Sequence, residues 1–166
     1  MIGATPVFCD IDPDTYHLSI ESVRRMYQPE VKAIVYPHLF GNISDMTEIQ
    51  DFCEEKNIKL IEDACQSFGA NRDGQYAGTY GDIATLSFNA NKPVAGISGG
   101  GAVLLDNKTQ ADFIRKLRRH GNNEVLGYNS KMLAINAEFI NFRISKMHAV
   151  YVDYFFVREC NLCSHG

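Results

Sequence analysis

The chain has 166 residues, of which 45% are hydrophobic and 22% are charged, so its length and composition fit one ordinary globular domain. A net charge of −4 and a pI near 5.7 indicate no basic surface, which argues against nucleic acid as a partner. The longest apolar run, at 149–157, contains Asp153 and is too short to span a bilayer, so we expect no membrane partner.

Strand and helix patterns alternate along the first part of the chain. The expected elements are, in order, a strand at 6–11, a helix after Ser19, a strand at 33–36, a helix after Asp45 and a strand at 58–61. Ser19 is expected to cap the first helix, and Asp45 with Glu48 predicts a capping box at the start of the second, which Asn57 ends. The run at 33–36 is entirely apolar, which is typical of a strand buried on both faces of a parallel sheet. The β-α-β-α-β order predicts a mostly parallel sheet flanked by helices.

The rest of the chain continues with a hairpin and two more strands. Asp73-Gly74 predicts a tight turn within 72–75, and strands are expected at 83–88 and 102–105. A helix is expected to begin at Asn107 or Thr109 and to end at Gly121, with Phe113 and Leu117 facing inward. A longer helix after Ser130 is expected to bury residues at three- and four-residue spacing, namely Leu133, Ala137, Ile140, Ile144 and Met147.

Polar side chains follow two of the expected strands at their carboxyl ends, where open α/β sheets bind ligands. Asp63 follows one strand and Lys92 follows the other. A lysine can form a Schiff base with an aldehyde, and a carboxylate can hold a proton on a cationic ring nitrogen. Most lysines and aspartates are surface residues, but the Gly-rich run after Lys92 suits close approach of the backbone to a phosphate. Pyridoxal 5′-phosphate is therefore the expected cofactor.

Three other residues are candidate cofactor ligands. Gln66 follows Asp63 by three positions and is able to flank the ring or bond its hydroxyl, although an ordinary loop amide explains it equally well. Ser87 and Asn129 are candidate phosphate ligands, and each taken alone is more typical of a turn or cap. His38 ends a strand, and a structural role is the preferred interpretation for it.

The five cysteines are an odd and scattered set, which indicates reduced thiols and predicts a cytoplasmic protein. Cys160, Cys163 and His165 have spacing that suggests zinc, but no second Cys-x-x-Cys completes a site, so no metal is expected. The glycines at 96–101 match neither a Walker A loop nor a dinucleotide-binding fingerprint.

Taken together, these motifs resemble the DegT/DnrJ/EryC1/StrS family of nucleotide-sugar aminotransferases, which have the aspartate-aminotransferase fold. The matching stretches are Gly3–Asp12, His38–Gly41, Ile61–Ala70, Gly81–Asp82, Ser87–Lys92, Gly99–Val103, Arg118–Gly121 and Gly127–Met132. They occur in family order and cover residues 1–147, which is far more specific than any one of them.

The resemblance implies a role for each candidate residue. Lys92 would be the Schiff-base lysine and the group that moves the proton during catalysis, and Asp63 would pair with the pyridine nitrogen. Gln66 would lie beside the ring and Ser87 at the phosphate, while Asn129 would reach the cofactor phosphate of a neighbouring subunit. A homodimer, a nucleotide-linked keto-sugar and glutamate as the usual amino donor are implied as partners.

The resemblance also implies a division of the chain. Residues 1–147 are expected to form part of the cofactor-binding large domain, and 148–166 are an atypical tail that is left unassigned. Family members are well over twice this length, and the expected missing parts are a phosphate-binding helix and a small domain that closes over the substrate. Two alternatives therefore stay open: a related sugar dehydratase, in which histidine replaces the lysine, and an inactive remnant or dimerising module of the family.

Overall fold

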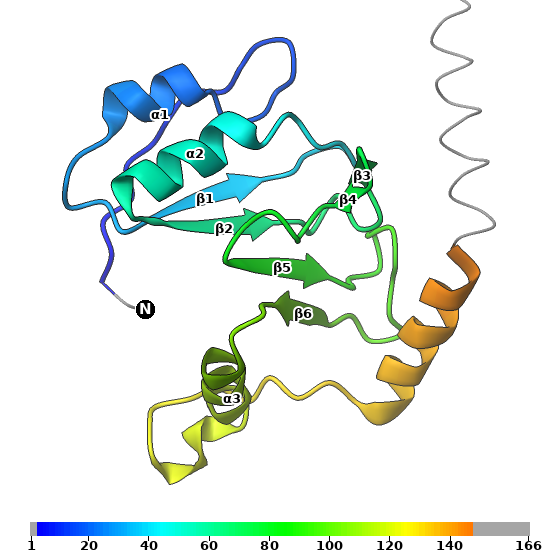
Figure 1. Ribbon diagram of the computed structural model, residues 1–166. Coiled ribbons are helices and arrows are strands. Elements are labelled where there is room, and N and C mark those ends of the chain that lie inside the picture. Colours follow the sequence, from blue (N-terminus) through cyan, green and yellow to red (C-terminus); the bar gives the residue numbers. More distant parts are fainter. Residues whose placement is uncertain (1–2, 148–166) are drawn as a thin grey trace, which may run out of the picture.

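A four-stranded sheet lies at the centre of the computed structural model, which describes residues 3–147 (Figure 1). The strand order is β1-β2-β5-β6, with bounds β1 Ala33–Pro37, β2 Lys59–Asp63, β5 Ile83–Ser87 and β6 Gly101–Leu104. Strands β1, β2 and β5 are parallel, and β6 is antiparallel to β5. The predicted mostly parallel sheet is confirmed.

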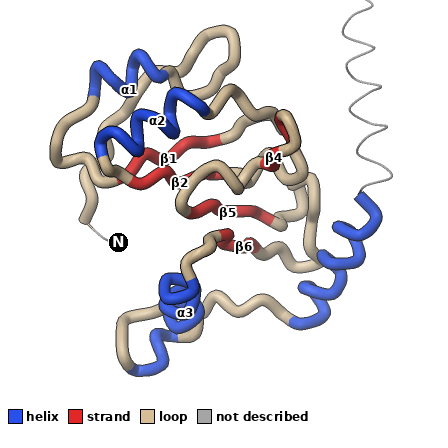
Figure 2. Tube along the Cα trace, viewed as in Figure 1, coloured by secondary structure: helices blue, strands red, loops and turns tan. Residues whose placement is uncertain are grey.

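Helices precede, separate and follow the strands of this sheet along the described chain (Figure 2). Their bounds are α1 Ile20–Met26, α2 Thr47–Lys56, α3 Lys108–Leu117, the short 3-10 turn η1 His120–Asn123, and a helical segment at 134–147. The predicted hairpin is confirmed as a two-stranded sheet of β3 Asn71–Arg72 and β4 Gln75–Tyr76. Its turn residues Asp73 and Gly74 both have positive φ, as a two-residue hairpin turn requires.

The hydrophobic core lies between helices α1 and α2 and one face of the sheet (Figures 1 and 2). Side chains alternate between the two faces of a strand, and the inward positions of the three parallel strands are the buried ones, namely Ile34, Tyr36, Leu60, Glu62, Ala84 and Leu86. On the opposite face Val35 is 60% exposed. The prediction that residues 33–36 are buried on both faces is therefore wrong, because the described residues cover this part of the sheet on one face.

Among the predicted ends of α1 and α2, those at Ser19 and Asn57 are confirmed, whereas the capping box is not. The Ser19 side chain caps α1 by accepting a hydrogen bond from the Ser22 N–H at 3.2 Å, as predicted. Asn57 ends α2 in the left-handed conformation, with φ of 52°, also as predicted. The capping box at the start of α2 is wrong: Asp45 bonds the Thr47 N–H from one position before the cap residue Met46, so Glu48 has no reciprocal partner there.

The structure differs from the sequence-based prediction at one expected strand, at the end of α3 and at several side chains that were expected to be buried. Residues 6–11 form no strand beyond a single bridge from Ile11 to Leu18, because no other strand lies alongside them. Helix α3 begins after its cap Asn107 but ends at Leu117, four residues before Gly121. None of its residues is fully buried, and Phe113 is exposed because the helix lies beyond the sheet edge (Figure 1). Leu133 precedes the helical segment and is also exposed, whereas Ile140 is buried.

Within residues 3–147 no helix has the length and apolar character needed to cross a membrane. The tail at 148–166, including the apolar run and the Cys160, Cys163 and His165 motif, lies outside the described residues.

Candidate functional site

The three parallel strands have their carboxyl ends on the same side of the sheet. Two candidate residues lie on this side, the carboxyl edge of the sheet. Asp63 is the last residue of β2 and is paired with Pro37 of β1 and Thr85 of β5. Ser87 is the last residue of β5 and is paired with Gly101, the first residue of β6. This is the edge at which open α/β sheets bind their ligands.

Asp63 is half-buried and is held at two points. Its backbone carbonyl accepts a hydrogen bond from the His38 N–H at 3.0 Å. Its carboxylate oxygen Oδ1 accepts one from the Cys65 N–H at 3.1 Å. These bonds fix both the main chain and the orientation of the carboxylate at the strand end.

Lys92 lies in the loop from β5 to β6 and is half-buried. Its backbone N–H donates to the Asn89 carbonyl at 3.0 Å, which closes a turn, and two further bonds join Phe88 to Gly96 and Gly100. Within residues 3–147 its ammonium group forms no salt bridge. A compact loop thus holds a half-buried lysine that no carboxylate of the described chain neutralises.

The Cys65 thiol lies two residues after Asp63, in an environment that changes its pKa. Burial raises the pKa of this thiol above its ordinary value, the Asp63 carboxylate raises it further, and the Lys92 ammonium group lowers it. The Cys65 sulfur also lies 3.7 Å from the Thr85 carbonyl oxygen. Asp63 ends β2, and Lys92 lies in the loop that follows the neighbouring parallel strand β5, so both residues come after the carboxyl ends of paired strands.

The remaining candidates are placed differently. Ser87 is half-buried, and its hydroxyl accepts a long bond of 3.4 Å from the Asn89 N–H at the base of the Lys92 loop. Gln66 is exposed in the turn after Asp63. Asn129 is exposed on a separate segment that bridges Arg119 next to α3, so it does not come from the strand ends.

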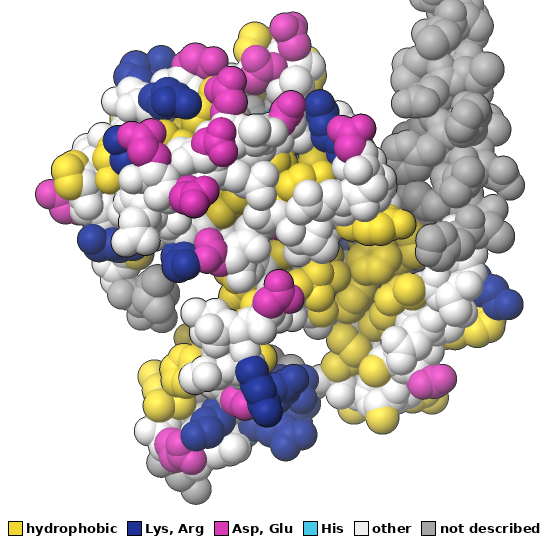
Figure 3. Space-filling model, viewed as in Figure 1, with side chains coloured by type: hydrophobic (Ala, Val, Ile, Leu, Met, Phe, Trp, Pro, Cys, Tyr) yellow, Lys and Arg dark blue, Asp and Glu magenta, His cyan; other side chains and the backbone are white. Residues whose placement is uncertain are grey.

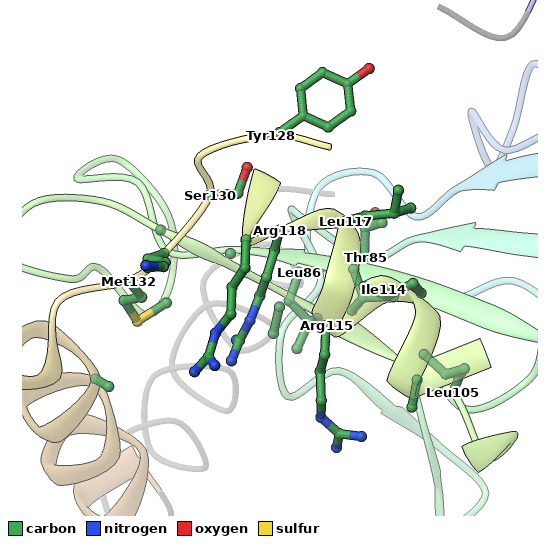
Figure 4. A pocket seen from close by; sticks show the side chains of 18 residues that line it. Thr85, Leu86, Leu105, Ile114, Arg115, Leu117, Arg118, Tyr128, Ser130 and Met132 are labelled. Carbon is green, nitrogen blue, oxygen red and sulfur yellow. The ribbon is translucent and has the colours of Figure 1, made fainter. Parts of the chain in front are cut away.

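A cavity of about 1050 Å³ separates the end of α3 from strands β5 and β6 (Figure 4). Thr85, Gly101 and Val103 line it on the sheet side, and Arg118 and Ser130 line it from the α3 side. Lysine and arginine side chains gather around α3, whereas apolar side chains gather toward helix 134–147 (Figure 3). The open face of the sheet is thus bordered by cationic groups.

One buried pair was missed at the sequence level. His38 Nε2 and Glu62 Oε2 lie 2.8 Å apart, and both side chains are fully buried. Glu62 also accepts from the backbone N–H groups of Gly78, Tyr80 and Gly81 at 2.7, 2.7 and 2.6 Å. Burial alone would raise the pKa of Glu62, but the bonds from His38 and the backbone outweigh it and hold that pKa below its usual value. The available signal was the alternation along β2, which places Glu62 on the same inward face as the buried Leu60 two residues before it.

Residues 3–147 contain no cluster of three or more histidine, cysteine or acidic side chains able to hold a metal ion.

The model of the DegT/DnrJ/EryC1/StrS aminotransferase family matches residues 1–152. The chain belongs to this family. A curated relative from Micromonospora megalomicea subsp. nigra, dTDP-3-amino-3,4,6-trideoxy-alpha-D-glucose transaminase, is 36% identical over 154 residues. That match covers 89% of this chain and 41% of the relative, so the chain spans about two fifths of the relative's length.

Two solved structures of the same fold carry information on the cofactor. NtdA from Bacillus subtilis, solved with bound PMP, is 34% identical with a TM-score of 0.73, covering 83% of this chain and 33% of that one. GDP-4-keto-6-deoxy-D-mannose-3-dehydratase from E. coli, solved with hydrated PLP, is 26% identical with a TM-score of 0.78, covering 84% and 42%. The chain therefore has part of the fold of pyridoxal phosphate-dependent sugar enzymes.

Proposed function

We propose that the chain is part of an enzyme that transfers an amino group to a nucleotide-linked keto-sugar with pyridoxal 5′-phosphate as cofactor. Glutamate is the proposed amino donor. The family and the names of its relatives support the reaction class. The observation that carries the proposal for this chain is that Asp63 ends β2 and Lys92 lies in the loop after the neighbouring parallel strand β5, where open α/β sheets bind ligands.

The chemistry of this edge fits the proposed cofactor. A carboxylate ends one strand, a hydroxyl ends its neighbour, and a half-buried lysine lies in the loop between them and β6. In that loop Gly99 has φ of +74°, a left-handed conformation that glycine adopts without the strain that a side chain would bring. When bound, pyridoxal phosphate supplies an electron-withdrawing ring that stabilises negative charge on the substrate carbon.

Each side chain at this edge has its own proposed role in binding the cofactor or moving a proton. The Asp63 carboxylate would hold the proton on the ring nitrogen, and the Ser87 hydroxyl would donate to the phosphate. The Lys92 amine would hold the cofactor between turnovers and, once displaced by the donor, would carry the proton to and from the substrate carbon as general base and acid. Gln66 is exposed in the turn after Asp63, where a substrate or the rest of the protein has access to it.

Asn129 is proposed to bind the cofactor of a second subunit. It lies on the segment beside α3 and not at the strand ends, so its proposed phosphate contact is to the cofactor of a neighbour in a homodimer. The homodimer is part of the proposal.

Two alternatives are tested by particular features of the chain. A sugar dehydratase resembles the chain in fold, but that class is expected to have a histidine where this chain has Lys92. An inactive remnant or dimerising module is favoured by the short span, since the chain covers only 41% of the transaminase relative.

The decisive test is a cofactor titration. The purified chain is mixed with pyridoxal phosphate, and visible absorption is recorded for the wild type, Lys92→Ala and the surface variant Lys32→Ala. The proposal predicts a band that is present in wild type and Lys32→Ala and absent in Lys92→Ala. A folded wild-type chain without the band would favour the inactive remnant.

A further inference from the structure

A buried hydrogen-bonded pair, His38 and Glu62, lies directly behind the proposed ring-nitrogen partner Asp63. Glu62 immediately precedes Asp63 on β2, so their side chains point to opposite faces of the sheet. Glu62 is fully buried on the core face of the sheet, which it shares with Leu60, whereas Asp63 is half-buried on the other face. Whatever holds Glu62 in place therefore also holds the backbone from which the Asp63 carboxylate projects.

Glu62 joins three separate segments. Its Oε2 accepts from the His38 ring and the Gly78 N–H, and its Oε1 accepts from the N–H groups of Tyr80 and Gly81. Each of these distances lies between 2.6 and 2.8 Å. A buried carboxylate is tolerated only when donors replace its water, and this one has four. The result is a rigid connection between the end of β1, β2 and the loop before β5.

His38 forms hydrogen bonds with both Glu62 and Asp63. Its ring bonds Glu62, and its backbone N–H donates to the Asp63 carbonyl at 3.0 Å. Within residues 3–147 its other ring nitrogen, Nδ1, is buried and has no hydrogen-bond partner, so the ring serves this pair through Nε2 alone. We propose that the His38–Glu62 pair positions Asp63, holding its main chain so that the carboxylate keeps its place at the cofactor edge.

The proposal rests on the proposed function only for what Asp63 does, and its first test needs no cofactor. Hydrogen exchange is measured on the full chain at the amides of His38 and Cys65, which donate to Asp63. In His38→Leu and Glu62→Gln, which remove the ring donor or one acceptor oxygen, exchange at both amides is expected to rise roughly tenfold relative to the amides of α2. His38→Gln, whose amide nitrogen is able to replace Nε2, is expected to restore protection.

Tyr36→Phe provides the matched control. Tyr36 is equally buried on the same face, its hydroxyl bonds Ser44, and the substitution keeps the aromatic ring that lies beside His38. It is expected to leave the His38 and Cys65 amides unchanged relative to α2. A parallel rise at α2 and at Cys65 in His38→Leu and Glu62→Gln would mean general destabilisation and would overturn the proposal, as would an effect equal to that of Tyr36→Phe.

A second measurement separates this inference from the proposed function. Pyridoxal phosphate affinity is expected to weaken roughly tenfold in His38→Leu and Glu62→Gln but not in His38→Gln or Tyr36→Phe. If wild type binds the cofactor and these two variants bind it equally well, the positioning role is refuted. If wild type binds none, the proposed function fails, and the exchange experiment still decides whether the pair positions Asp63.

Discussion

Replacing Gly81 with alanine tests the packing that encloses Glu62. A Cβ added at this position would lie 2.6 Å from the Leu60 carbonyl oxygen and 3.2 Å from its carbon, both backbone atoms of the central strand β2. The loop would have to move by several tenths of an ångström. That movement would weaken the Gly81 N–H bond to Glu62, at 2.6 Å, and the Asp82 N–H bond to Leu60, at 2.9 Å.

The expected loss follows from these two bonds. A bond to a charged group contributes about 1.5–3 kcal/mol and a neutral backbone bond about 0.5–1.5 kcal/mol. Alanine lowers the entropy of the unfolded chain, which offsets about 0.4–1 kcal/mol. Gly81→Ala should therefore lower the free energy of unfolding by about 2–3 kcal/mol. Urea unfolding followed by circular dichroism measures this as a lower midpoint at constant slope.

Thr79→Ala is the control in the same loop. Its exposed hydroxyl donates to the Tyr76 carbonyl at 2.7 Å, so the expected cost is below about 1 kcal/mol. A Gly81→Ala chain that is as stable as Thr79→Ala, or more stable than wild type, would refute the contact between this loop and β2.

Three further predictions concern one helix end and two buried groups whose protonation makes the chain sensitive to acid. Ser19→Ala should destabilise the chain by about 1 kcal/mol in urea unfolding because the α1 cap is lost, while Ser19→Asn should retain most of it; equal stability of all three chains would contradict the cap. Burial holds the pKa of His17 below its ordinary 6.5, so the unfolded chain gains a proton that the folded chain does not, and the free energy of unfolding should fall as pH drops from 6.5 towards the lowered value. His17→Phe should flatten that part of a urea-midpoint profile between pH 5 and 8, and an unchanged slope would exclude His17 as its source. The pKa of Glu62 is also lowered, so a further loss should begin below pH 4.5 as its carboxylate is protonated, and Glu62→Gln should lack it.

The sequence predicted the local signals of the fold well. Ser19, Asn57 and the Asp73-Gly74 turn act through neighbours only a few residues away, so the pattern contains all the information needed. The strands at the sheet centre were also predicted within two residues, because their apolar runs are bounded by polar segments.

Failures occurred where burial depends on distant segments. Residues 6–11 have a β-prone composition but no strand beside them, and Phe113 lies on a helix at the sheet edge. The run at 33–36 has the apolar composition of a strand that is buried on both faces. Val35 is nevertheless exposed, because one face of the sheet is open in the described chain.

The candidate site was also predicted only where local sequence patterns determine it. The strand-end rule predicted from sequence alone that Asp63 and Lys92 follow strands at their carboxyl ends, and the structure has Asp63 at the end of β2 and Lys92 in the loop after β5. The His38–Glu62 pair joins residues 24 positions apart, and no local pattern records such a pairing. The roles proposed for all five candidate residues remain predictions, namely those of Lys92, Asp63, Gln66, Ser87 and Asn129.

The central claim is that Lys92 holds the cofactor opposite Asp63, and covalent trapping tests it most directly. The chain is incubated with pyridoxal phosphate, reduced with borohydride, digested and analysed by peptide mass spectrometry, with Lys92→Arg treated in parallel. The account predicts that the reduced cofactor is found on Lys92 and that Lys92→Arg is unlabelled. Labelling spread evenly over surface lysines, or the same labelling in Lys92→Arg, would contradict it.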